Sequence, residues 1–301
     1  MESVERDKIV QALLSQIKKY VPKQGYNLTA VPEVVLYRQD KPRERTFFLS
    51  EPLIAVVLQG SQSLLLGDDE LVYNSGDYLL VSVTGLPVLV RFRDASPEYP
   101  YIALGFKLDL QVVRQILVEH GLAFPSIKSS CGRGITTGKA TEDLLHAFTR
   151  LVAVLNQPED IPALYGGIKH EIIYRLLTGE QGEYLREIAV TGTRSNRIAR
   201  VVEWIRKHYR ESLKVEELAF EVGLGVSTLY HHFHMLTAMS PLQYQKRLRL
   251  TEARRLMLEE SYDAGTAAFQ VGYESQSQFT REYRRLFGTP PLRDIKTLLK
   301  R

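Results

Sequence analysis

The sequence has little of what small proteins use as covalent or metal staples. It contains one cysteine, Cys131, so neither an internal disulfide nor a Cys-rich zinc site can form. No histidine precedes His120, which argues against an enzyme that holds iron or zinc in the N-terminal part through two or more histidines. P-loop, nucleophile-elbow and dinucleotide fingerprints are also absent. We therefore expect a protein that is not an enzyme and that has no cofactor.

Long apolar runs are missing as well. The longest, at residues 53–58, 64–66 and 78–83, fall far short of the roughly 20 residues that a membrane-spanning helix needs. Residues 1–20 mix acidic and basic side chains through an amphipathic helical pattern, unlike a secretory signal. These features predict a cytoplasmic protein with no membrane segment.

Charge is the next feature, and its distribution says more than its total of +4. Residues 193–301 carry 19 Lys and Arg against 12 Asp and Glu, a net charge of +7, whereas residues 1–192 carry 20 against 23, a net charge of −3. A length of 301 residues predicts two domains. The split favours a second domain that binds a phosphate backbone, although two merely solvated surfaces would give the same numbers.

The first domain reads as β structure followed by helices. Between residues 32 and 107, short stretches rich in Val, Leu, Tyr and Phe alternate with turn formers every 8 to 12 residues or so, which is typical of a sandwich or small barrel. Residues 109–177 then show helical spacing of apolar residues. They are interrupted by a loop at 124–139 that we expect to be mobile. The fold class predicted is α+β, with a β-barrel and trailing helices.

A polar stretch at 190–196, with one glycine, lies where the charge changes sign. We interpret it as a linker, which gives a sensor domain at 1–189 and a second domain at 197–301. Every pattern beyond the linker is helical.

The second domain contains an internal repeat. The stretch AFEVG at 219–223 is echoed by AFQVG at 268–272. A small residue where two helices cross, followed four residues later by a glycine that can adopt a left-handed conformation, is what a helix-turn-helix requires. Ser240 and Pro241 form a start signal for the long helix between the copies. Two such units in one chain can enter successive major grooves about 34 Å apart.

Four further stretches have a recognisable pattern: AMSPLQY at 238–244, Arg249-Leu250 with Ala253-Arg254, VGY at 271–273 and FGTPP at 287–291. With them, residues 195–295 resemble the DNA-binding domain of the AraC/XylS family of transcriptional regulators. Gln59-Gly60 and residues 73–82 resemble the cupin-like N-terminal barrel of one branch of that family. The resemblance implies a sequence-specific transcription activator controlled by a small-molecule effector in the barrel. Its partners would be a double-stranded DNA operator, RNA polymerase and, through the helices at 109–177, a second copy.

The resemblance also implies which residues contact DNA. Side chains that read bases fall on Ser227, Tyr230 and His231 in the first recognition helix and on Gln276, Ser277, Thr280 and Arg281 in the second. Arg284 and Arg285 either contact phosphates or are merely solvated. Arg281 can bond both acceptors of a guanine, and Gln276 the acceptor and donor of an adenine. His231 and His234 can share a helix face, but no cysteine or carboxylate nearby completes a zinc set, so we expect no metal there.

The effector site is less defined. Candidates for an anionic ligand are Tyr37, Arg38, Arg43, Arg45, Arg91 and Arg93, and the competing interpretation is that these arginines are simply exposed. Cys131, with Lys128 and Arg133 nearby, offers an alternative regulator that senses oxidants or electrophiles, as against a plain unreactive thiol. The remaining alternative is a metal enzyme built on the cupin-like barrel.

Overall fold

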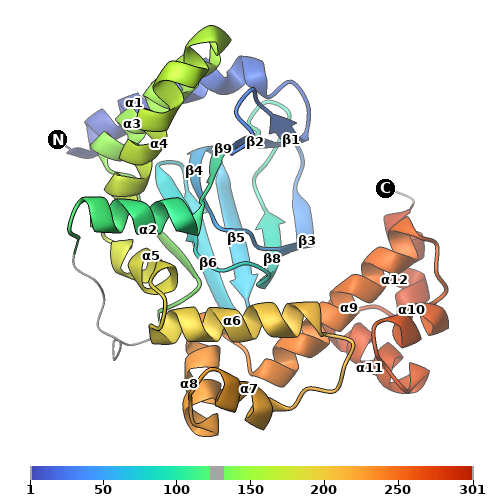
Figure 1. Cartoon of the computed structure of the whole chain (residues 1–301). Coiled ribbons are helices and arrows are strands. Elements are labelled where there is room, and N and C mark those ends of the chain that lie inside the picture. The colour runs from blue at the N-terminus through green and yellow to red at the C-terminus, as the bar shows by residue number, and fades with distance from the viewer. Residues whose placement is uncertain (1, 123–131, 300–301) are drawn as a thin grey trace. The chain divides into compact units, whose positions relative to one another are not determined.

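The protein forms two compact units that divide between Ala199 and Arg200. The computed structural model describes residues 2–122 and 132–299. The first unit combines strands and helices, and the second is all helical (Figure 1). This confirms the predicted α+β class. None of the helices in the described ranges combines the length and apolar character that a membrane crossing requires.

Two antiparallel sheets form the barrel of the first unit. One has six strands in the order β1-β2-β9-β4-β7-β10, and the other has four in the order β3-β8-β5-β6. The strands are β1 (Gly25–Leu28), β2 (Val34–Gln39), β3 (Arg43–Leu49), β4 (Leu53–Gln59), β5 (Ser61–Leu66), β6 (Asp69–Asn74), β7 (Asp77–Val81), β8 (Pro87–Phe92), β9 (Tyr101–Lys107) and β10 (Ile135–Lys139). The predicted loop at 124–139 is therefore wrong at its end, because β10 pairs with β7 from Ile135 to Lys139.

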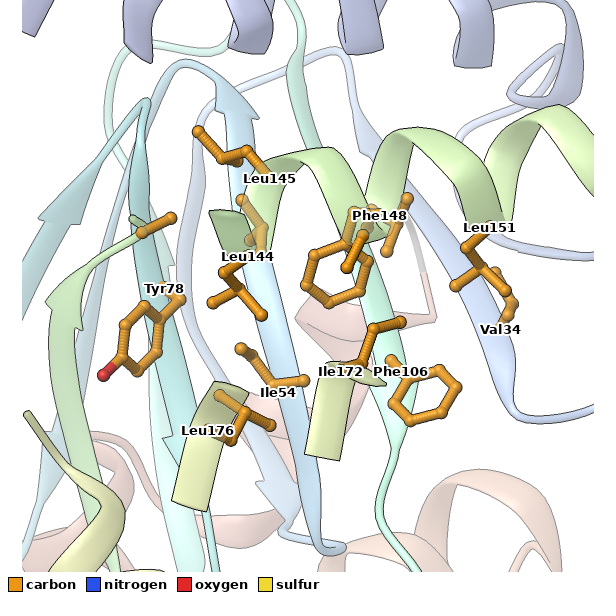
Figure 2. Packing of buried hydrophobic residues seen from close by; sticks show 14 of the residues in the cluster. Val34, Ile54, Tyr78, Phe106, Leu144, Leu145, Phe148, Leu151, Ile172 and Leu176 are labelled. Carbon is orange, nitrogen blue, oxygen red and sulfur yellow. The ribbon is translucent and has the colours of Figure 1, made fainter. Parts of the chain in front are cut away.

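Three helices cover the outer face of the six-stranded sheet: α1 (Glu2–Ile17), α3 (Glu142–Leu155) and α4 (Ile161–Thr178). Figure 2 shows Ile54 and Phe106 of the sheet packed beneath side chains of α3 and α4. The rings of Phe106 and Phe148 are 6.5 Å apart, edge to face. Because helices cover the outer face and the barrel interior lies on the other, strand β4 is almost uninterruptedly apolar.

The remaining elements of this unit are α2 (Leu110–Glu119), α5 (Gly182–Ala189), the start of α6 (Arg194–Lys207) and two 3-10 turns, η1 (Lys18–Tyr20) and η2 (Pro158–Asp160). Helix α6 begins inside the stretch expected to be a linker, so only residues 190–193 separate it from α5. Thr193 and Ser195 in this stretch are buried and bonded: Ser195 donates to the Glu187 carboxylate over 2.6 Å, and the backbone N–H of Asn196 donates to the Thr193 hydroxyl over 3.1 Å. Their polarity serves to cap α6 and attach it to α5.

The second unit contains two helix-turn-helix motifs on either side of one long helix. Beyond α6 its helices are α7 (Val215–Glu221), α8 (Val226–Thr237), α9 (Pro241–Glu259), α10 (Ala264–Gln270), α11 (Gln276–Phe287) and α12 (Pro291–Leu298). The first motif is α7 with α8, the second is α10 with α11, and α9 connects them (Figure 1). As predicted, Ser240 caps α9: its hydroxyl accepts from Gln243 N, and the Gln243 side chain bonds back to Ser240 N.

Both turn glycines have the predicted left-handed conformation, with φ of +65° at Gly223 and +90° at Gly272. A Cβ atom on Gly272 would lie 2.3 Å from the carbonyl oxygen of Arg210, so this position excludes any side chain. Ala219 and Ala268, four residues earlier, are buried where the helices cross. The spacing of the repeat is thus set by backbone conformation and close packing.

Candidate functional site

Helices α8 and α11 each bury one face and expose the other. Leu229 and Phe233 anchor α8, and Phe279 and Tyr283 anchor α11; all four are fully buried. The contrast between the buried and the exposed face is strongest in α11, where the exposed polar and cationic side chains lie away from Phe279. The anchors therefore determine which residues point to solvent.

The exposed face of α11 carries a cluster of cations. Arg281, Arg284 and Arg285 are exposed, as are Gln276 and Ser277. Among the residues that the structure describes, none hydrogen-bonds or ion-pairs with these three guanidinium groups. These five residues, expected to contact DNA from the second recognition helix, thus share the exposed surface of α11. Thr280 is the exception, since it is half-buried and its hydroxyl donates to the Gln276 carbonyl over 2.9 Å.

The exposed face of α8 differs in chemistry. Ser227, Tyr230 and His231 are exposed, with Tyr230 retaining 41% of its surface. The three side chains carry hydroxyl or imidazole groups, so this helix presents hydrogen-bonding groups and rings where α11 presents guanidinium groups.

Helix α11 is fixed to α9 through a hydrogen-bonded carboxylate. Glu282 accepts hydrogen bonds from Lys246 over 3.0 Å, from the Tyr273 hydroxyl over 2.8 Å and from Gln278 over 3.3 Å. Burial alone raises the pKa of Glu282, but these bonds outweigh it, so the pKa lies below its ordinary value. Glu282 therefore stays ionised and holds α11 in place.

A second bridge joins α9 to α12. The guanidinium of Arg254 donates to both oxygens of Asp294, over 2.8 and 3.1 Å, and the Tyr283 hydroxyl donates to the same carboxylate over 2.8 Å. Arg254 was visible in the sequence only as part of a family pattern. Its role in positioning α11 through Tyr283 could not be read there, because Asp294 lies 40 residues away.

The barrel of the first unit has a partly open cavity of about 450 Å³ between the two sheets. Its lining is mostly apolar, and small residues make the space. Ala55 and Gly105 are paired in register on β4 and β9, and Ala103 lies two residues along on the same face. Side chains with at most one carbon, in the middle of the sheet, leave a hollow where larger residues would fill the barrel.

The two ends of the cavity differ in chemistry. An aromatic cluster lies at one end: Tyr37 stacks on Phe92 with ring centroids 5.6 Å apart, and Phe92 meets Tyr101 edge to face at 4.9 Å. At the opposite end of β9, six residues and about 20 Å away, Lys107 lines the cavity and pairs with Glu51 over 3.1 Å. The cavity is therefore largely apolar, with the aromatic cluster toward one end of β9 and the Lys107–Glu51 ion pair toward the other.

Of the arginines predicted to bind the effector, the four whose side chains the structure describes, Arg38, Arg43, Arg91 and Arg93, do not line this cavity. Tyr37 does, but Arg38 points to the other face of its strand, where it pairs with Asp40 over 2.6 Å and donates to the Val21 carbonyl. Arg43 is exposed beside the Tyr37 hydroxyl, and Arg93 pairs with Glu70 over 3.3 Å.

The remaining candidates are Arg91, Arg45 and the redox candidate Cys131. Val90 and Phe92 line the cavity, so Arg91 between them faces outward. The side chain of Arg45 and the whole of Cys131 lie outside the described residues. The cation of the cavity, Lys107, was missed, although alternation along β9 from Tyr101 through Ala103 and Gly105 indicates it.

A hollow barrel joined to two helix-turn-helix motifs defines a DNA-binding regulator with a ligand-sized cavity in a separate domain. Residues 30–184 match the AraC-type transcriptional regulator N-terminus, and residues 218–296 match a helix-turn-helix domain. The chain belongs to the AraC family of transcriptional regulators, as the sequence resemblance indicated.

Named relatives match parts of the chain. The thermoregulatory protein LcrF of Yersinia pestis is 27% identical over 56% of this chain and 64% of its own length. The transcriptional activator RhaS of Escherichia coli is 25% identical over 52% of this chain and 56% of its own length. The chain thus spans less than two thirds of these relatives.

Solved structures of ToxT from Vibrio cholerae share the fold. One has a TM-score of 0.54 and 11% identity and covers 87% of this chain and 97% of ToxT. Another, a ToxT structure with a bound unsaturated fatty acid, has a TM-score of 0.52 and 10% identity. It covers 87% of this chain and 94% of ToxT.

Proposed function

We propose that this chain is a sequence-specific transcription activator whose DNA binding is controlled by a small molecule in the barrel cavity. The observation that carries the proposal is the exposed face of α11, where three guanidinium groups lack partners in the described part of the chain. Unpaired, solvated cations on a helix that a buried aromatic core holds rigid are suited to the phosphates and base edges of a major groove.

The division of roles follows from the chemistry of each side chain. Arg281 and Gln276 are the base readers of α11, because guanidinium and carboxamide groups can each form two hydrogen bonds with one base. Ser277 and Thr280 would add single contacts, and Arg284 and Arg285 would bind phosphates. On α8, Ser227, Tyr230 and His231 read the second half of the operator. The partner is double-stranded DNA. A transcription activator would also contact RNA polymerase, and the description of RhaS as a transcriptional activator supports activation.

The cavity favours a particular effector class. A largely apolar cavity with Lys107 toward one end fits a molecule with a long apolar body and an anionic head, whose carboxylate would compete with Glu51 for the ammonium group. The fatty acid described for ToxT, which has the same fold, has this chemistry. The alternative through Cys131 gains no support, since that residue is outside the described residues. The described cavity lining contains no histidine for a metal enzyme.

Substitution of Arg281 tests the DNA-reading role. A preferred operator is first selected from random-sequence DNA with the full chain, and affinities are then measured for that operator and for unrelated DNA. The Arg281→Ala variant should lose about 1 to 3 kcal/mol on the operator and little on unrelated DNA. The matched variant Arg284→Ala should weaken both DNAs alike. Equal losses for Arg281→Ala on both DNAs would reduce this residue to a phosphate contact.

A further inference from the structure

Three side chains with metal-binding atoms lie together outside both the cavity and the DNA-reading helices. Glu119 ends α2, His120 is its C-cap residue, and His170 is in α4. We propose that these residues bind a divalent ion of the zinc type and join α2 to α4. The site lies among the helices of the first unit and does not depend on the DNA-binding role.

The distances are those of a zinc site. The Nε2 atoms of His120 and His170 are 3.2 Å apart, and His170 Nε2 is 3.3 Å from a Glu119 carboxylate oxygen. All three ligand atoms lie within 4.8 Å of one another. Bonds of about 2.0 to 2.1 Å in a tetrahedral zinc site place neighbouring ligands about 3.4 Å apart. The three atoms therefore need little movement to surround one ion.

The surroundings orient these ligands toward a cation. Gln115, one turn earlier on α2, donates to the other oxygen of Glu119 over 2.8 Å, as outer partners of metal ligands do. The His120 ring packs on Tyr174, with centroids 4.9 Å apart. The C-terminal end of α2 adds the negative end of a helix dipole.

The donor set selects the class of ion. Two imidazole nitrogens and one carboxylate oxygen suit zinc and similar late transition metals, whereas magnesium and calcium prefer oxygen ligands alone. The side chains of Glu119 and His170 keep 45% and 39% of their surface, so the ion is reached from solvent. A fourth position is left for water, and the binding should be reversible.

Zinc titration of the full chain against a chromogenic chelator tests the site. We expect one tight equivalent, and a visible absorption of tetrahedral cobalt when Co²⁺ replaces zinc. The variants His120→Gln and His170→Gln should bind more than about 100-fold more weakly, since loss of an outer partner alone costs 10- to 100-fold. His146→Gln, which removes an exposed histidine of α3, should bind as the parent does.

A second control separates this site from α8. The double variant His231→Gln/His234→Gln should keep the tight equivalent, and circular dichroism should show that every variant is folded. If the tight equivalent disappears with His231 and His234, or if His170→Gln binds zinc as the parent does, the site is not formed by these residues. If the folded parent binds no zinc, the three side chains form only a hydrogen-bonded cluster and the proposal fails. DNA affinity is measured separately, so failure here leaves the proposed function intact.

Discussion

The guanidinium of Arg249 donates a hydrogen bond to the carbonyl oxygen of Gly272 over 2.8 Å. Arg249 lies in α9, and Gly272 is the turn glycine of the second helix-turn-helix. The same side chain donates to the carbonyls of Tyr209, Arg210 and Glu211, which follow α6, over 2.6 to 3.1 Å. One side chain thus satisfies backbone acceptors in two segments and fixes the turn that precedes α11.

Replacement of Arg249 by lysine should be costly although the charge is kept. A lysine ammonium cannot reproduce a planar donor set that serves four carbonyls, and each hydrogen bond to a charged group contributes about 1.5 to 3 kcal/mol. We expect Arg249→Lys to lose about 3 kcal/mol of unfolding free energy in urea denaturation. Arg255→Ala, on the same helix but paired with half-buried Glu252 and exposed Glu259 and Glu260, should lose less than about 1 kcal/mol. Similar losses in the two variants would show that Arg249 is an ordinary surface residue.

Gly272 itself should tolerate no side chain. An added Cβ would lie 2.3 Å from the Arg210 carbonyl oxygen, in addition to the strain of φ at +90°. Gly288 has a similar φ of +80° but open space around it, so it isolates the conformational term. We expect Gly288→Ala to cost about 1 to 2 kcal/mol, and Gly272→Ala at least about 2 kcal/mol more because backbone must move. Thermal denaturation of the two variants measures the difference, and equal costs would mean that the close approach is unimportant.

Glu282 should make the second helix-turn-helix sensitive to acid. Its pKa is below the ordinary 4.5 in the folded protein, so its stabilisation is fully present above that value and is lost as the pH falls through the lowered folded value. The variant Glu282→Gln should be less stable at about pH 7 and should lose less stability than the parent between about pH 5 and about pH 3. Glu274→Gln, which removes an exposed carboxylate from the segment between α10 and α11, should follow the parent curve. If the stability of Glu282→Gln falls with pH as the parent's does, this carboxylate does not cause the acid sensitivity.

The sequence predicted the second unit well because its constraints are local. Ala219, Gly223 and their repeats satisfy a backbone requirement within five residues, and Ser240 caps a helix three residues away. Exposure of Arg281 also follows from local spacing, since Phe279 fixes the buried face. These features need no knowledge of distant contacts.

The cavity and the proposed metal site depend on distant pairings and could not be predicted in the same way. His120 and His170 are 50 residues apart, and their convergence depends on how α2 packs against α4. Arg38 was expected near a ligand, but alternation along β2 sends it to the face opposite Tyr37. Knowing which face of a strand lines a barrel requires the register of both sheets.

Lys107 should determine how strongly the cavity prefers an anion. Oleate has an apolar chain for the cavity and a carboxylate for the ammonium group, whereas oleyl alcohol has the same chain and no charge. Calorimetry with the full chain should show that Lys107→Gln binds oleate about 10-fold more weakly, equivalent to about 1.4 kcal/mol, and oleyl alcohol unchanged. Ala55→Leu, which fills the middle of the cavity, should weaken both ligands.

The matched control for this measurement is Lys139→Gln. Lys139 is an exposed lysine of β10 that pairs with Asp77 over 3.3 Å, much as Lys107 pairs with Glu51, but it does not line the cavity. Its removal should leave oleate affinity unchanged, because a solvated ammonium outside the cavity cannot reach the ligand carboxylate. If Lys139→Gln weakens oleate as much as Lys107→Gln does, the effect is one of net charge. If Lys107→Gln weakens the alcohol equally, the lysine supports the wall of the cavity and does not recognise an anion.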